Sequence, residues 1–174
     1  MPEPKHIEPG RPFVAVEVAV LRTIADQTHV LLTTETSGPC VGMEALPGGL
    51  IAHQEPLTAA ANRIIAGPTG RTVEARHLFS LDTYERSYRH IAEWTIAFAY
   101  MAEGDAIPGI GETEPVAGTR WALVDDLLED MKRGNLLAYH HSAIIRDAAE
   151  VLRDSVLWPP SKTSVIGTNL RERA

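Results

Sequence analysis

The sequence predicts an α/β sandwich, in which a mixed set of strands is accompanied by one central and one C-terminal helix. Alternating valines in residues 13–21 indicate a strand with one buried face. The apolar spacing becomes that of an amphipathic helix in residues 56–66 and again in residues 143–157. A chain of 174 residues, with 44% hydrophobic and 22% charged residues, fits a single folded domain.

The strands are predicted from the alternation of apolar and polar residues and from the turn residues between these segments. Residues 28–34 form a second predicted strand after a turn at residues 25–27. Pro47, Gly48 and Gly49 predict another turn. The remaining predicted strands are residues 73–81, 93–101 and 119–123, and the predicted loops between them are the polar residues 82–90 and the Gly- and Pro-containing residues 103–118.

The central helix has a clear apolar face and an early predicted end. Its apolar positions are Leu57, Ala60, Ala61, Ile64 and Ile65. Pro68 is expected to stop the helix after residue 66, because proline lacks an N–H and collides with the carbonyl group four residues earlier. Gly70 then supplies a left-handed residue after the helix. A further helix is predicted over residues 124–131.

Composition limits the class of protein. We expect a flexible arm at residues 1–12, one domain at residues 13–158 and a polar tail at residues 159–174. The net charge of −7 argues against direct binding of nucleic acid, which needs a basic surface. The chain has no apolar run long enough to span a membrane and no secretory signal, so we expect a cytoplasmic protein.

Residues 46–70, LPGGLIAHQEPLTAAANRIIAGPTG, resemble the Nudix box, whose pattern is G-x5-E-x7-R-E-U-x-E-E-x-G-U with U aliphatic. The matching positions are Gly49, Glu55, Arg63, Ile65 and Gly70. The departures lie at the three later glutamate positions, where this chain has Ile64, Gly67 and Pro68, and at the final aliphatic position, where it has Arg71.

The flanking segments support the same resemblance. The strand in residues 93–101 and Trp121 before an acidic helix start look like their counterparts in the family. Residues 137–141, LAYHH, resemble the stretch that commonly ends Phe-Asp-His in the ADP-ribose-type branch. The resemblance covers residues 13–157, and it implies a Nudix-type α/β/α sandwich with a mixed sheet.

The resemblance also implies which half of the box is kept. Family members use the later glutamates to hold Mg²⁺ or Mn²⁺, and Glu55 alone cannot build such a site because a hard cation needs several oxygen ligands. We therefore expect no metal or other cofactor, and no standard diphosphate hydrolysis. Gly48, Gly49, Arg63 and Gly70 are the structural part of the box, and an ion pair between Glu55 and Arg63 is expected to tie the loop to the helix.

Several titratable and aromatic groups are candidates for other chemistry. The candidate catalytic residues are Glu44, His53, Glu55, Glu93, His140 and His141, which could act as acids or bases near neutral pH. The candidate ligand-binding residues are Tyr84, Arg86, Tyr88, Arg89 and Tyr139, which could stack on a base or meet a phosphate. The alternative for each group is structural: a solvated loop, an ion pair, or one packed and one exposed histidine.

Three hypotheses for the function remain at this point. The first is an enzyme with a metal-independent acid–base mechanism acting on a small metabolite, such as a nucleotide derivative. The second is a non-catalytic sensor of ADP-ribose or NAD-like nucleotides; related sensors carry a winged helix, for which the 17 residues after Leu157 are too few. The third is a metal-dependent nucleoside-diphosphate hydrolase that recruits Glu44, Glu85 and Glu93. All three take a small-molecule ligand, and family habit implies a homodimer.

Overall fold

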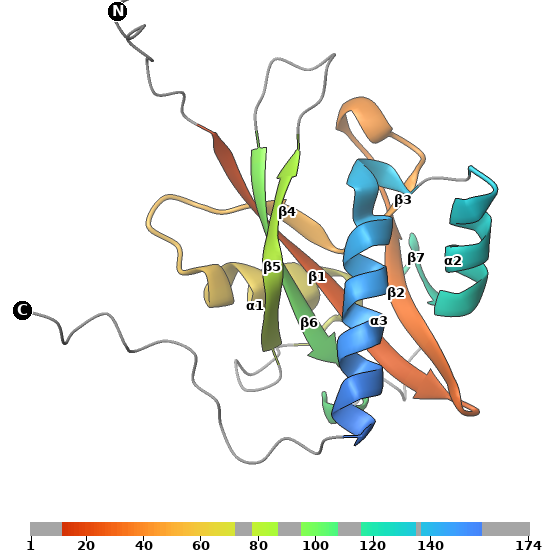
Figure 1. Ribbon diagram of the computed structural model, residues 1–174. Coiled ribbons are helices and arrows are strands. Elements are labelled where there is room, and N and C mark those ends of the chain that lie inside the picture. The colour runs from red at the N-terminus through yellow and green to blue at the C-terminus, as the bar shows by residue number, and fades with distance from the viewer. Residues whose placement is uncertain (1–11, 72–77, 87–94, 108–115, 135–136, 158–174) are drawn as a thin grey trace, which may run out of the picture.

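The computed structural model describes residues 12–71, 78–86, 95–107, 116–134 and 137–157. Within these residues, a seven-stranded mixed sheet lies between helix α1 on one face and helices α2 and α3 on the other (Figure 1). The strands are β1 Phe13–Ile24, β2 Gln27–Thr34, β3 Glu44–Ala45, β4 Gly48–Leu50, β5 Leu78–Arg86, β6 Thr95–Glu103 and β7 Thr119–Leu123. The helices are α1 Leu57–Thr69, α2 Val124–Lys132 and α3 His141–Leu157, with short 3₁₀ turns at Gly38–Cys40, Gly104–Ala106 and Ala138–His140.

Strand β1 is the centre of the sheet, and its two edges are used differently. One edge pairs with the parallel strand β6 along its length. The other edge pairs with β4 at its beginning, where Glu17 opposes Gly48, and with β2 at its end, where Leu21 opposes Val30. Strand β2 in turn pairs with both β1 and β3 on one edge and with β7 on the other. Strands β1 and β2 therefore diverge, and residues 44–50 fill the gap between them.

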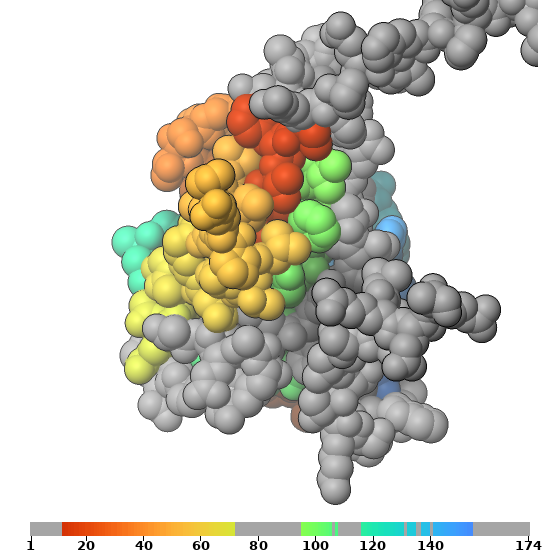
Figure 2. Space-filling view, turned by 90° about the vertical axis from the view of Figure 1, so that its left-hand side faces the viewer, coloured from red at the N-terminus to blue at the C-terminus, as the bar shows by residue number. Residues whose placement is uncertain are grey.

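The alternation predicted for β1 is confirmed by the two hydrophobic clusters. Val16, Val18 and Val20 pack with the apolar face of α1, including Ala61 and Ile65. Figure 2 looks onto the face of the molecule that includes the segment leading into α1. The intervening residues of β1 face the other side of the sheet, which α3 covers.

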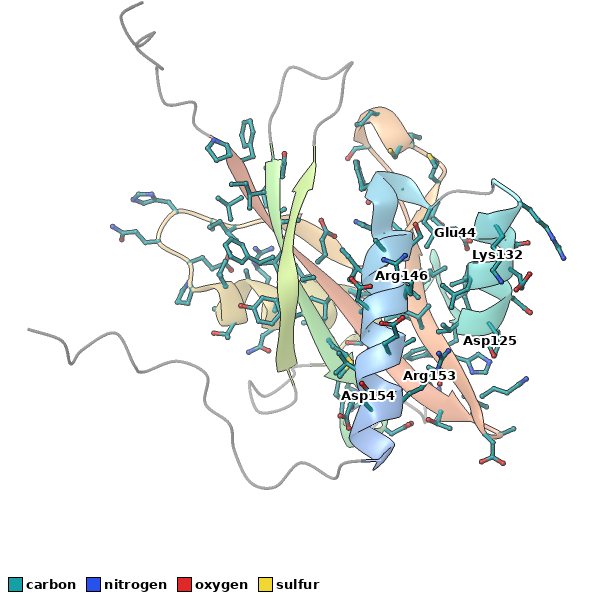
Figure 3. The ribbon with its side chains drawn as sticks, in the orientation of Figure 1. Glu44, Asp125, Lys132, Arg146, Arg153 and Asp154 are labelled. Atoms are coloured by element: carbon teal, nitrogen blue, oxygen red, sulfur yellow. The ribbon has the colours of Figure 1, made fainter. Side chains whose placement is uncertain are left out.

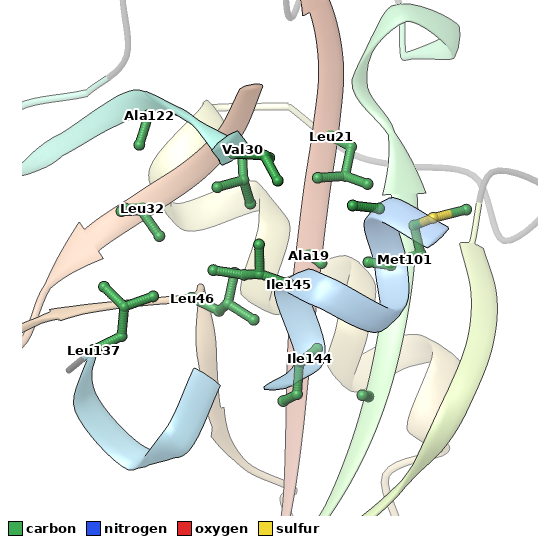
Figure 4. Packing of buried hydrophobic residues seen from close by; sticks show 14 residues of the cluster. Ala19, Leu21, Val30, Leu32, Leu46, Met101, Ala122, Leu137, Ile144 and Ile145 are labelled. Atoms are coloured by element: carbon green, nitrogen blue, oxygen red, sulfur yellow. The ribbon is translucent and has the colours of Figure 1, made fainter. Parts of the chain in front are cut away.

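The α3 side of the sheet holds the larger cluster. Ala19 and Leu21 of β1 pack there with Leu46, Ile144 and Ile145 (Figure 4). Charged residues lie on the outer side of α3, where Arg153 Nη2 is 3.7 Å from Asp125 Oδ1 of α2 (Figure 3). The predicted α/β/α sandwich with a mixed sheet is thus confirmed. No helix in the described ranges is long and apolar enough to cross a membrane.

The central helix continues past its predicted end. Helix α1 runs to Thr69 and includes Pro68, so the expectation that Pro68 stops it after residue 66 is wrong. The lost N–H belongs to the last turn, where the hydroxyl of Thr69 donates to the carbonyl of Ile65 at 2.6 Å. Gly70 ends the helix in the left-handed conformation with φ of 64°, and its N–H donates to Ala66 as predicted for a glycine cap.

Two other segments also differ from the sequence prediction. Residues 82–86 belong to β5 rather than to a loop, and their backbone pairs with β6 after a register shift between Ser80 and Thr83. A polar strand is stable there because β5 lies at the edge of the sheet. Gly48 and Gly49 lie in β4 and not in a turn. Residues 1–11 of the predicted arm and the predicted tail lie outside the described residues.

The packing of α1 predicts a large effect of Ile65→Ala. Ile65 is fully buried between α1 and β1, and removing three methyl or methylene groups there leaves a cavity. The free energy of unfolding should fall by about 2–5 kcal/mol in urea denaturation. Thr58→Ala, on the exposed side of the same helix, should stay within about 0.5 kcal/mol of the wild type. Equal losses in both variants would contradict this packing.

Candidate functional site

The segment between β4 and α1 is held by the predicted ion pair. Arg63 Nε lies 2.7 Å from Glu55 Oε1, and Arg63 Nη2 donates to Glu55 Oε2 at 2.8 Å and to the carbonyl of Leu50 at 3.2 Å. The N–H of Ala52 also donates to Glu55 at 2.8 Å. These bonds, with that from Arg63 the largest cause, lower the pKa of Glu55 to about 2. The carboxylate therefore stays ionised and engaged, which is unsuited to a general base at neutral pH.

Glu44, a second candidate acid, is held in a similar way at the start of β3. Its carboxylate accepts hydrogen bonds from Arg120 Nε at 2.5 Å and from Arg120 Nη2 at 2.7 Å. These hydrogen bonds raise the pKa of Arg120. The pair borders a cavity of about 170 Å³ lined by Leu32, Thr33, Thr34, Glu44, Gly118, Thr119 and Arg120. Ligand pockets for small molecules occupy roughly 300–1,000 Å³, so this cavity is too small for a whole nucleotide.

His53 lies on a strained turn before α1. The N–H of Glu55 donates to the carbonyl of Ala52 at 3.1 Å, which closes a turn with His53 and Gln54 at its centre. Gln54 has φ of 60°, a conformation that disfavours residues with a side chain. The side chain of His53 is exposed, so it is open to a ligand or to solvent.

His141, by contrast, is buried, in a polar cluster on the α3 side of the sheet. Its ring is 1% exposed, and Nδ1 accepts the N–H of Leu46 at 2.8 Å. Its Nε2 lies 3.2 Å from Oε2 of Glu17, which is also buried. Because the Leu46 N–H must find an acceptor, Nδ1 carries no proton, and the neutral ring has its proton on Nε2, facing Glu17.

Glu17 was missed by the sequence reasoning, although a signal for it exists. It is the one acidic residue of β1 and interrupts the alternation of valine with alanine over residues 14–20, and such a buried carboxyl group needs a partner. Gly48 makes room for it: a Cβ added to Gly48 would lie 1.7 Å from Glu17 Oε2. Next to it, a Cβ added to Gly49 would have no atom within 4 Å.

The remaining candidates are placed only in part. Tyr139 has φ of 55° and ψ of 27°, and its ring centroid lies 5.6 Å from that of His141. Of the two adjacent histidines, His141 points inward; the expectation that at most one of them does so stays a prediction. Tyr84 and Arg86 are placed only by the backbone of β5, His140 only by that of its 3₁₀ turn, and Glu93, Tyr88 and Arg89 lie outside the described residues.

The described candidates do not converge on one centre. Glu44 is on β3, Glu55 precedes α1, and His141 opens α3 beneath the sheet. Across the described ranges, no group of three or more His, Cys, Asp or Glu side chains is arranged to hold a metal ion.

Comparison with known proteins gives a family and a set of related folds. The family model described as the NUDIX domain matches residues 14–141. No curated protein matches the sequence. The crystal structure of Shewanella oneidensis NrtR is similar, with a TM-score of 0.67 and 24% identity over 82% of this chain and 64% of that chain. This chain therefore spans less than two thirds of that relative.

Two further structures show the same likeness. The NUDIX domain of the same NrtR, complexed with ADP ribose, has a TM-score of 0.64 and 24% identity over 82% of this chain and 90% of that chain. A MutT/nudix family protein from Enterococcus faecalis has a TM-score of 0.66 and 21% identity over 87% and 66%. NrtR is also known complexed with a 27mer DNA. At these identities the likeness shows the fold.

The ion pair at Glu55 predicts a specific pH dependence of stability. Because the pKa of Glu55 falls from 4.5 to about 2 on folding, the unfolded chain binds the proton more readily. The stabilisation is complete above pH 4.5 and is lost as the pH falls through about 2. Glu55→Gln should therefore flatten the loss of unfolding free energy over this range in urea titrations.

Arg63→Met should flatten the same slope, and combining it with Glu55→Gln should add little, since both changes remove one interaction. A wild-type slope in Glu55→Gln would show that the ion pair does not persist in solution.

The neighbouring glycines of β4 give a second prediction. Gly48→Ala forces the buried carboxyl group of Glu17 to move and should cost about 1–3 kcal/mol of unfolding free energy. Gly49→Ala has open space and should change stability by at most about 0.5 kcal/mol. Thermal or chemical denaturation of the two variants measures the difference. Equal stability of the two would mean that Glu17 does not lie against Gly48.

Proposed function

This chain belongs to the Nudix domain family, and we propose that it is a binding module for a nucleoside diphosphate of the ADP-ribose kind, which it holds without hydrolysing it. The proposed ligand is a small molecule, and we propose that binding requires no Mg²⁺ or Mn²⁺. A homodimer and the absence of direct contact with nucleic acid remain predictions.

The observation that carries the proposal is the state of the helix that bears the box. Glu55 is bound by Arg63 through two hydrogen bonds and by the N–H of Ala52. At the positions of the later family glutamates, Ile64 packs into the core, and Gly67 and Pro68 offer no side-chain oxygen. Because hard divalent cations require several oxygen ligands, this donor set does not fit the family's metal ions.

The nature of the ligand is supported by the comparison with NrtR. Its NUDIX domain has been crystallised with ADP ribose, and this chain covers 90% of that domain. A diphosphate suits the exposed α1 side of the molecule, where Arg63 retains a side chain that is 50% exposed.

A metal-independent enzyme is the second candidate, and His53 favours it. This side chain is exposed beside the strained Gln54 and is the one described candidate histidine that is open to solvent. An imidazole is a group that could transfer a proton to a bound ligand. The metal-dependent alternative has less support, since Glu44 is engaged by Arg120.

Binding and turnover can be separated in one experiment. The protein is dialysed against EDTA, and its thermal unfolding is followed with ADP-ribose, with AMP or with ribose 5-phosphate. A ligand at 100 times its Kd stabilises the folded state by about 2.7 kcal/mol, a rise in Tm of roughly 5–10 °C for a chain of this size. The same samples are examined by ³¹P NMR for cleavage of the diphosphate.

Of the three ligands, we expect only ADP-ribose to raise the Tm. Its diphosphate should stay intact with or without Mg²⁺ or Mn²⁺. Cleavage that depends on added metal would refute the proposal. Cleavage in EDTA that disappears in His53→Ala would favour the enzyme. If ADP-ribose gives no shift, this class of ligand is wrong.

A further inference from the structure

We propose that His141 is the positioning residue of the ligand site, because its ring fixes the segment Leu46–Gly49 between the diverging strands β1 and β2. The inference rests on the proposed function for its effect on the ligand, but the positioning itself can be measured without one. It changes the role of His141 from a candidate acid or base to a group that acts through the backbone.

The need for such a residue comes from the divergence of the strands. Residue 45 pairs with β2 and residue 48 pairs with β1, so Leu46 and Pro47 cross the gap without a strand partner. Pro47 has no N–H, and its carbonyl accepts the N–H of Val18 at 2.8 Å. The N–H of Leu46 is left to a side chain, and a buried N–H without an acceptor is strongly unfavourable.

His141 meets this need and also connects to β1. Its Nδ1 accepts from Leu46 at 2.8 Å, and its Nε2 faces the Glu17 carboxyl group at 3.2 Å. The carboxyl group of Glu17 in turn occupies the space that a side chain at position 48 would fill. The ring therefore contacts the crossing segment on one side and, through Glu17, the strand that follows the crossing on the other.

From this point the chain leads directly to the proposed ligand site. The strand that contains Gly48 and Gly49 ends at Leu50, whose carbonyl accepts a hydrogen bond from Arg63 at 3.2 Å. Arg63 also holds Glu55, which fixes the turn at the start of α1. A displacement at Leu46 is thus carried along β4 to the segment that faces the ligand.

The backbone just before α3 orients the His141 ring toward the sheet. Tyr139, the middle residue of the 3₁₀ turn that precedes α3, takes a left-handed conformation with φ of 55°. It packs with Cys40 and Ala138 in a small cluster beside β3. This kink, uncommon for a residue with a side chain, lets the chain enter α3 with His141 facing the sheet.

The hydrogen bond itself can be detected in the wild-type protein. In a ¹⁵N-labelled sample, a scalar coupling across the N–H···N bond should join the Leu46 amide nitrogen to His141 Nδ1. The ring should show an unprotonated Nδ1 and a protonated Nε2. A ring with its proton on Nδ1, or no coupling, would overturn the proposal whether or not any nucleotide binds.

Two substitutions then separate the two sides of the ring. In His141→Asn the amide oxygen takes the place of Nδ1 and can still accept from Leu46, whereas in His141→Gln the amide reaches toward Glu17 and leaves Leu46 without its acceptor. His29→Gln, at the far end of β2, is the matched histidine control.

His141→Gln should shift the backbone amide resonances from Leu46 to Ala52 and weaken ADP-ribose binding by about tenfold or more, measured well below the Tm. His141→Asn should keep most of the wild-type amide resonances in this segment and most of the affinity for ADP-ribose, and His29→Gln should leave both unchanged. If the shifts in His141→Gln end at direct neighbours of the ring, or if His141→Asn weakens binding equally, the positioning role is wrong. Should His141→Gln fail to fold, His141→Asn and the wild-type coupling still decide.

If the wild type shows the coupling and His141→Gln shows the shifts from Leu46 to Ala52, but the wild type binds no ADP-ribose, the positioning inference stands and the proposed function fails. The two ideas can therefore be rejected separately.

Discussion

The divergence of β1 and β2 is the constraint on which the rest of this structure depends. A single strand, β1, exchanges β4 for β2 along one edge, and the chain between β3 and β4 fills the opening. This arrangement leaves backbone groups near the centre of the fold that no strand can satisfy. Proline removes one donor at residue 47, and His141 accepts the other from Leu46. The packing of α3 against the sheet thus completes the sheet's own hydrogen bonding.

A polar cluster in such a place is costly to build and equally costly to break. Burying a carboxyl group and an imidazole is unfavourable unless each finds a partner. Here the Leu46 N–H donates to His141 Nδ1, His141 Nε2 lies 3.2 Å from Glu17 Oε2, and the absence of a side chain at Gly48 provides the room. Apolar residues could fill the same volume, but they would not accept a hydrogen bond from the crossing segment. The cluster therefore specifies one geometry for that segment.

The elements of this fold that have one apolar face could be predicted from the sequence, whereas a contact between residues far apart in the chain could not. Alternation in β1 and helical spacing in α1 and α3 were readable because one face of each element is apolar. The early stop at Pro68 was wrong because a proline in the last helical turn loses only the one bond to the carbonyl of Ile64, while Gly70 still donates to Ala66 and closes the helix. The loop expected at residues 82–86 was wrong because an edge strand tolerates polar residues. The Glu55–Arg63 pair was predictable from box spacing, whereas the Glu17–His141 contact joins residues 124 positions apart in sequence, with no local pattern to reveal it.

The metal-ligand positions of the box and its ion pair have separate physical roles. Metal ligands are required only by the chemistry of a metal. The ion pair between Glu55 and Arg63 is required by the geometry, because it fastens the end of β4 and the turn at Gln54 to α1. A helix can therefore carry Ile64, Gly67 and Pro68 and still hold the preceding segment in place. Holding this segment in place and binding a metal ion are therefore separate requirements, and only the second one needs further oxygen ligands on the helix.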